Sequence, residues 1–254
     1  MSTYIESGHA KNTANFDHLI ALLLTYSTNY TPSTANLAIT NLQTVLTNAQ
    51  GALTTVKNEY NGWKNATNSR EIAFEPLKGL STRLLNTLMS VGANEQTIKD
   101  YKTLNAKVQG SKLTKADSGI VVDPSEDIAN KTTLPVKKTV SVSQQSFDNL
   151  IEHYDKIIKL LASVPAYNPP EIALKVATLQ TMLANLKTVN TGAYTSYAKV
   201  SNARIARNKI LYDNPDALIV LAKAVKAYIK GKFGATSAEY GQVSSIKFVK
   251  VVKK

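Results

Sequence analysis

The residues able to do acid–base or metal chemistry are few in this chain and widely spaced. Its 254 residues include three histidines (His9, His18 and His153) and no cysteine. The missing cysteine excludes thiolate catalysis, disulfides and cysteine-ligated zinc or iron–sulfur centres. No two histidines stand four residues apart, as a helical metal site would require. Glu6 and His9 have the Glu-x-x-His spacing of di-iron bundles, but no second such motif completes a site. We therefore expect ordinary surface histidines and no metal.

Sequence signatures of catalysis and of phosphate binding are also missing. The chain contains no G-x-x-x-x-G-K-[ST] phosphate loop, no G-x-G-x-x-G turn and no G-x-S-x-G elbow. Its acidic residues, seven in 1–110 and seven in 143–254, are scattered rather than grouped as acid–base pairs. We therefore predict that the protein is not an enzyme and uses no cofactor.

Positive charge is concentrated near the end of the chain. Against 18 acidic residues stand 30 basic ones, a net charge of +12. Residues 143–254 hold sixteen basic and seven acidic groups, and their whole excess lies beyond Ala198. Such a surface attracts phosphate backbones or acidic proteins. The alternative is a solvated lysine face that only keeps the protein soluble. Eight lysines, the first three spaced along one helical face, form the predicted polyanion-binding surface: Lys223, Lys226, Lys230, Lys232, Lys247, Lys250, Lys253 and Lys254.

Short blocks of sequence recur in the same order in the two halves of the chain. The clearest pairs are Asn15–Ile20 with Ser146–Ile151, Tyr30-Thr31-Pro32 with Tyr167-Asn168-Pro169, and Gly92-Ala93 with Gly234-Ala235. The offset between partners grows from one pair to the next, which puts the length differences in loops. We predict a tandem duplication: a helical bundle repeat over 1–109, an irregular linker over 110–142, and a second repeat over 143–254 whose C-terminal half is basic.

Each copy is predicted to form a four-helix unit around one long helix. Apolar residues at alternating spacings of three and four run from Leu46 to Leu77 and from Leu183 to Leu211. A pattern of that length indicates a helix of about 40 residues. Strands need a period of two, which these segments lack. The predicted fold is therefore all-α, with an approximate two-fold relation between the copies.

Capping residues predict where the shorter helices begin and end. The first helix of each copy should start at Phe16 or Phe147, because a short polar residue precedes each one. Gly92 and Gly234 suit helix C-termini. In the second copy, Pro215 and Asp216 suit the first turn of the third helix. Thr236 and Glu239, three residues apart, have the spacing of a capping box at the start of the fourth helix.

Two arginines, Arg70 and Arg207, fall on the apolar face of the long helices. An unpaired charge there would cost several kcal/mol. We expect structural ion pairs that use Asp17 and Asp148, the acids retained near the start of each copy. The alternative is a pair of pseudo-symmetric anion sites.

Three blocks of the sequence resemble an uncharacterised protein family from the bacterial phylum Bacteroidota: Ser141–Asp148, Ser201–Arg204 and Gln242–Phe248. The likeness covers nearly the whole chain, but it implies no activity and no site residues.

The longest aliphatic run near the N-terminus, Leu19–Leu24, is far shorter than the roughly 20 residues that span a bilayer. We therefore expect a cytoplasmic protein without membrane contact.

The composition leaves two functional hypotheses. The first is a non-enzymatic binding or scaffold protein whose basic C-terminal half contacts a polyanion, which is RNA, a ribonucleoprotein or another acidic partner. The second is a self-assembling structural protein that forms dimers or polymers without a nucleic-acid role. Charged residues make up only 19% of the chain, so repulsion between copies is weak.

Overall fold

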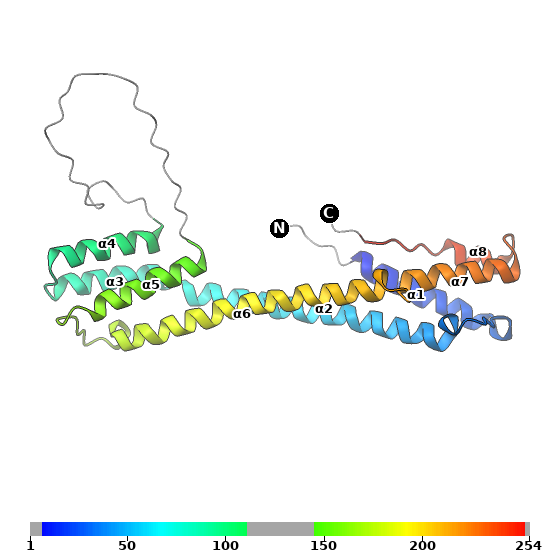
Figure 1. Ribbon diagram of the computed structural model, residues 1–254, viewed down its shortest axis with the longest axis horizontal. Helices are drawn as coiled ribbons and strands as arrows, with labels where there is room; N and C mark the ends of the chain where they lie inside the picture. The colour runs from blue at the N-terminus through cyan, green and yellow to red at the C-terminus, as the bar shows by residue number, and fades with distance from the viewer. Residues whose placement is uncertain (1–6, 111–144, 252–254) are drawn as a thin grey trace, which may run out of the picture. The chain divides into compact units, whose positions relative to one another are not determined.

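The computed structural model describes residues 7–110 and 145–251, and these residues form helices without any strand (Figure 1). The predicted all-helical fold is confirmed. A π-helical turn, Lys209–Asp213, directly follows α6. The helices in chain order are α1 (Ser7–Thr25), α2 (Ile39–Phe74), α3 (Leu77–Ser90), α4 (Glu95–Gln109), α5 (Phe147–Ala162), α6 (Val176–Asn208), α7 (Leu218–Phe233) and α8 (Ala238–Ser245).

Two helices are much longer than the others. Helix α2 has 36 residues and α6 has 33, close to the length that the apolar spacing predicts. On α2 the buried positions Leu42, Leu46, Ala49 and Val56 follow spacings of four, three and seven. Those spacings keep the apolar side chains on one face of the helix, where they can be buried together.

The chain divides into two compact units, and the boundaries fall inside α2 and α6. Unit 1 comprises Met1–Lys64 and Thr195–Lys254, and unit 2 comprises Asn65–Tyr194. Each long helix therefore contributes one part to each unit. This division into units differs from the predicted repeats 1–109 and 143–254, and the duplication itself stays a prediction. The predicted linker 110–142 lies almost wholly outside the described residues.

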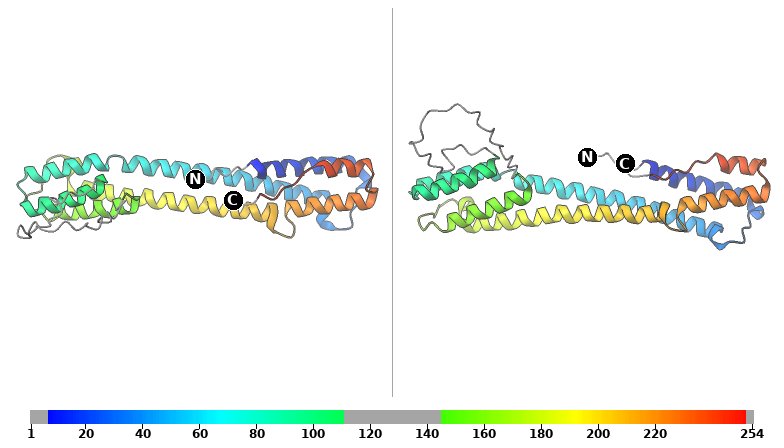
Figure 2. Two further views of the ribbon diagram at one scale, coloured as in Figure 1. Left: turned by 90° about the horizontal axis from the view of Figure 1, so that it is seen from above. Right: turned by 45° about the horizontal axis from the view of Figure 1, so that its top comes forward.

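The core of unit 1 joins α1 to α7 and α8. Helices α7 and α8 lie side by side in all three views (Figures 1 and 2), and α1 packs against both of them. Their fully buried side chains include Phe16, Leu19 and Leu23 from α1, which pack with Leu218 and Val225 from α7. Burying a large apolar side chain contributes about 1.5–3 kcal/mol, so these contacts fix α7 against α1.

The core of unit 2 joins α4 to α3 and α5. Tyr101, which is fully buried on α4, donates a hydrogen bond of 2.8 Å from its hydroxyl to the carbonyl oxygen of Ser81 on α3. Burial raises the pKa of Tyr101, and the nearby Tyr167 and Tyr154 raise it further, so its hydroxyl stays a donor. Tyr154 and Ile157 of α5 lie in the same core.

Local capping signals were correct at several helix ends. The Ser146 side chain accepts a hydrogen bond of 3.2 Å from the backbone N–H of Asn149, as predicted for the start of α5. Gly92 and Gly234 follow the ends of α3 and α7 with φ of 71° and 97°. A positive φ is cheap for glycine because it has no Cβ.

Other predicted helix ends were wrong. Helix α1 begins at Ser7 rather than at Phe16, because His9 and Asn12 are buried by tertiary contacts that its short-range pattern does not reveal. Helix α7 begins at Leu218, so Pro215 and Asp216 precede it.

The cap of α8 was misplaced by one residue. The Ser237 side chain accepts from the backbone N–H of Tyr240 at 3.1 Å, in place of the predicted Thr236. Both residues are hydroxyl side chains, so their types alone did not separate them.

Candidate functional site

Most of the net positive charge lies in unit 1. Its two chain segments carry 15 basic and 6 acidic residues, a net of +9, whereas unit 2 carries 15 and 12, a net of +3. Helix α7 alone holds four lysines and no acidic residue. Its lysines therefore have no acidic partner on their own helix.

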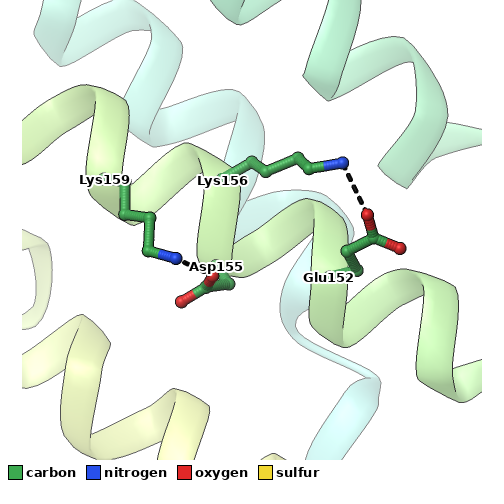
Figure 3. Close-up of polar contacts among 4 residues, drawn as sticks. All are labelled: Glu152, Asp155, Lys156 and Lys159. Carbon is green, nitrogen blue, oxygen red and sulfur yellow. Dashed lines mark hydrogen bonds and ion pairs between the residues drawn. The ribbon is translucent and has the colours of Figure 1, made fainter.

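The lysines of α5 in unit 2 show the opposite arrangement (Figure 3). Lys156 pairs with Glu152 and Lys159 pairs with Asp155, each at 2.6 Å and one helical turn apart. The hydrogen bond and charge of Lys156 lower the pKa of Glu152. These lysines are compensated within their helix, so they attract an external anion less strongly than those of α7.

Five of the predicted lysines are exposed: Lys223 and Lys230 on α7, Lys247 in the segment that follows α8, and Lys232 and Lys250, whose contacts are described below. The Lys230 ammonium lies 5.6 Å from the centroid of the Tyr240 ring, a contact that an exposed lysine can leave at little cost. Lys253 and Lys254 lie outside the described residues. Because Lys232 and Lys250 pair with other side chains of unit 1, Lys223, Lys230 and Lys247 are the members of the predicted surface that are best placed to meet an external anion.

Three other predicted lysines make contacts within unit 1. Lys226 donates to the carbonyl oxygen of Ile246 and lies 5.3 Å from the centroid of the Phe248 ring. Burial, with the neighbouring Lys247 charge, lowers the pKa of Lys226. Two further contacts involve exposed side chains: Lys250 pairs with Asp213 at 2.8 Å, and Lys232 donates to the Thr31 hydroxyl at 3.0 Å. The helical spacing of the lysines gave no sign of these roles.

The segment after α8 is held along α1 by asparagine side chains. Asn12 donates from Nδ2 to the carbonyl oxygen of Val249 at 2.7 Å and accepts from the Val249 N–H at 3.1 Å. Asn15 donates from Nδ2 to the carbonyl oxygen of Lys247 at 2.6 Å. The ring of Phe248 meets Phe16 edge-on at 6.5 Å between centroids. These bonds position the backbone that carries Lys247 and Lys250.

An Asn12→Ala variant should therefore lower the free energy of unfolding by about 1–3 kcal/mol, because it removes both hydrogen bonds between the buried Asn12 side chain and the backbone of Val249. Urea unfolding followed by circular dichroism measures the change. Asn48→Ala is the matched control, since Asn48 is exposed on α2 in the same unit. Equal unfolding midpoints for the two variants would show that the asparagine contacts do not hold the segment.

In unit 2, Arg70 and Asp148 meet at the amide of Asn190. The Arg70 Nη1 donates to Asn190 Oδ1 at 3.3 Å, and Asn190 Nδ2 donates to Asp148 Oδ1 at 2.8 Å. The Arg70 guanidinium lies 4.0 Å from the centroid of the Phe147 ring. The Tyr194 hydroxyl donates to Asp148 Oδ2 at 2.7 Å, and this bond raises the pKa of Tyr194. The described hydrogen bonds thus link the two predicted partners through an amide.

Arg207 in unit 1 is fully buried, unlike Arg70, which is half-buried. Its Nε and Nη2 donate to Asn208 Oδ1 at 3.2 and 2.9 Å. Asp17 is exposed on α1, and the described contacts do not bring it to either arginine. Sequence reasoning missed Asn190 as a partner, although its place on the apolar face of α6 was a usable signal.

Two of the three histidines are buried, so the prediction of surface histidines was wrong for them. His9 is fully buried and its Nδ1 lies 2.7 Å from the Tyr212 hydroxyl. His153 is 4% exposed, and burial lowers its pKa. Only His18 is exposed. Across 7–110 and 145–251, no three His, Cys, Asp or Glu residues gather in a way that could hold a metal ion.

Comparison of the chain with known protein families, with curated proteins and with solved structures finds no match. Among the described helices, none combines the length and the hydropathy that crossing a membrane requires. Charge, burial and contacts are therefore the observations from which a function can be proposed.

Proposed function

We propose that the protein is a non-enzymatic binding protein and that unit 1 contacts a polyanion, with RNA as the first candidate. The observation that carries the proposal is the net charge of +9 on unit 1, where α7 contains lysines without a single acid. A surface of this kind raises the local concentration of a polyanion and speeds its association.

The exposed lysines are the groups that would meet the phosphates. Lys223, Lys230 and Lys247 are exposed, whereas the Lys226 ammonium donates to the carbonyl oxygen of Ile246 and lies over the Phe248 ring. A lysine acts on a phosphate as a point charge, so binding should depend on the number of lysines more than on base sequence.

Replacing Lys223, Lys230 and Lys247 with glutamine should weaken RNA binding at least tenfold at moderate salt. Each phosphate contact on a single strand contributes about 0.7 to the slope of log K against log salt, so three lost contacts should lower the slope by about 2. Fluorescence anisotropy with a labelled 20-nucleotide RNA across a salt series measures both quantities.

The matched control replaces Lys102, Lys175 and Lys187, which are exposed in unit 2, and removes the same total charge. This control should keep most of the affinity and the salt slope. If both triple variants lose binding equally, the effect is net charge and not a surface on unit 1. If the unaltered protein binds no RNA and sediments as dimers or polymers, the self-assembly hypothesis takes its place.

We also propose that the two halves of the chain derive from one duplicated sequence. Two hydrogen bonds of the same type support this: Tyr30 donates from its hydroxyl to the carbonyl oxygen of Leu37 at 2.7 Å, and Tyr167 does so to Leu174 at 2.9 Å. The starts of α2 and α6 are separated by the same 137 residues as these two tyrosines. Under this proposal each unit combines the first helix of one copy with the third and fourth helices of the other.

A further inference from the structure

Three aromatic side chains on the α2 and α6 parts of unit 1 lie outside its core: Tyr60, Trp63 and Tyr197. We call them the aromatic cluster. Tyr60 is 37% exposed, Tyr197 is 56% exposed and Trp63 is half-buried. The Trp63 ring lies 5.7 Å from Tyr197 and 5.6 Å from Tyr60 between centroids. These rings contact one another and leave part of their surface open to solvent.

Basic side chains accompany the aromatic cluster. The Lys64 ammonium lies 5.7 Å from the centroid of the Trp63 ring and 6.0 Å from that of Tyr60. Lys57, Tyr60 and Lys64 are three and four residues apart, so they share one face of α2, and all three are exposed. The Tyr60 ring thus lies between two lysines on this face.

We propose that the aromatic cluster stacks the bases of a single-stranded nucleic acid while Lys57 and Lys64 contact its phosphates. The inference rests on the proposed polyanion function and narrows its ligand. Proteins that hold single strands combine basic groups with aromatic rings, because every base has a π-face that can stack. A duplex keeps its bases stacked within itself and cannot offer them in this way.

Charge complementarity decides between this occupant and others. A second copy of unit 1 brings another net charge of +9 to the same surface, which opposes docking of like on like. An acidic polypeptide would satisfy the lysines but brings no regular series of planar groups for the rings. A single-stranded nucleic acid supplies both the negative charge and the planar groups.

The chain contains a single tryptophan, so its fluorescence reports on the aromatic cluster directly. Titration of the full chain with a 15-nucleotide oligo(U) should quench Trp63 emission in a saturable way. Heparin, a polyanion without bases, should compete for binding yet leave the emission nearly unchanged.

Variants at Tyr197 separate stacking from charge. Tyr197→Leu keeps an apolar side chain but removes the ring, so oligo(U) binding should fall about 5- to 100-fold while heparin binding stays the same. Tyr197→Phe keeps the ring and should bind as the unaltered protein does. Ile205→Ala, at another exposed apolar position of α6 in unit 1, controls for general effects on the helix, and thermal unfolding shows that each variant is folded.

The outcomes separate this inference from the proposed function. If oligo(U) binds with a steep salt dependence but Trp63 emission does not change and Tyr197→Leu binds normally, the polyanion function stands and base stacking is refuted. If neither oligo(U) nor heparin binds, the proposed function fails and this inference fails with it. If Trp63 emission changes with protein concentration alone, a second copy covers the aromatic cluster and the inference is overturned.

Discussion

Cutting the chain between Ser118 and Gly119 is expected to leave the two fragments bound to each other in solution. Unit 1 takes 7–64 from the first fragment and 195–251 from the second, and unit 2 takes 65–110 and 145–194. Every compact unit therefore contains sequence from both sides of the cut.

Separating the fragments would open both cores at once. In unit 1, Phe16 of the first fragment packs in one cluster with Val225 of the second. In unit 2, Tyr101 packs in one cluster with Tyr154 and Ile157. Each of these large side chains contributes about 1.5–3 kcal/mol on burial, and each core contains many of them. The sum exceeds the roughly 4–15 kcal/mol that association costs in lost freedom.

A protease site introduced at this position, followed by complete cleavage and size-exclusion chromatography with light scattering at about 1 µM, tests the expectation. A single species near the 27.6 kDa of the intact chain should remain, and two fragments should appear only in denaturant. If residues 1–109 and 143–254 formed two self-contained bundles instead, the cleaved fragments would elute as separate species.

The sequence predicted what is set by neighbours along the chain. The start of α5 depends on one hydroxyl, that of Ser146, and one backbone amide three residues later. The ends of α3 and α7 depend on glycines that tolerate a positive φ. The length of α2 follows from apolar spacing alone. Each of these features depends on residues that are close together along the chain, so the sequence suffices to find it.

Features that depend on distant segments could not be predicted. Helix α1 extends nine residues before Phe16 because His9 and Asn12 are buried against Tyr212 and Val249, which lie more than 200 residues away. The division of α2 between two units is of the same kind, since apolar periodicity shows which face of a helix is buried and not which segment covers it.

In the candidate site, too, the features set by local sequence could be predicted and those that depend on distant segments could not. The charge excess and the lysines of α7 could be read from composition and spacing, because helical spacing fixes which side chains share a face. The anchoring of Lys226 by Ile246 and Phe248 could not, since it requires the path of the chain after α8. The aromatic cluster could not be predicted from the sequence either. Tyr60 and Trp63 fit the apolar spacing of α2, and only the solvent exposure of their side chains in the structure distinguishes them from core residues.

Arg207→Leu is expected to lower the free energy of unfolding by about 3–5 kcal/mol. The Arg207 side chain is fully buried, and Asn208 Oδ1 accepts bonds from two of its nitrogens. Leucine removes the donors to the half-buried Asn208, and its smaller volume leaves a cavity where the buried guanidinium lay. A loss of this size is the result expected if the Arg207 guanidinium has a structural role.

Arg70 provides the comparison, because it stands 137 residues earlier on the corresponding part of α2 and is only half-buried. Arg70→Leu loses the bond to Asn190 and the stacking on Phe147. Because the Arg70 side chain is only half-buried, its replacement leaves a smaller cavity than that of Arg207, and the expected loss is about 1–2 kcal/mol. Urea unfolding of both variants, fitted with one common slope of free energy against urea concentration, gives the two losses in free energy of unfolding. A smaller loss for Arg207→Leu than for Arg70→Leu would show that burial of the Arg207 guanidinium does not stabilise unit 1, and would return the anion-site alternative for that residue.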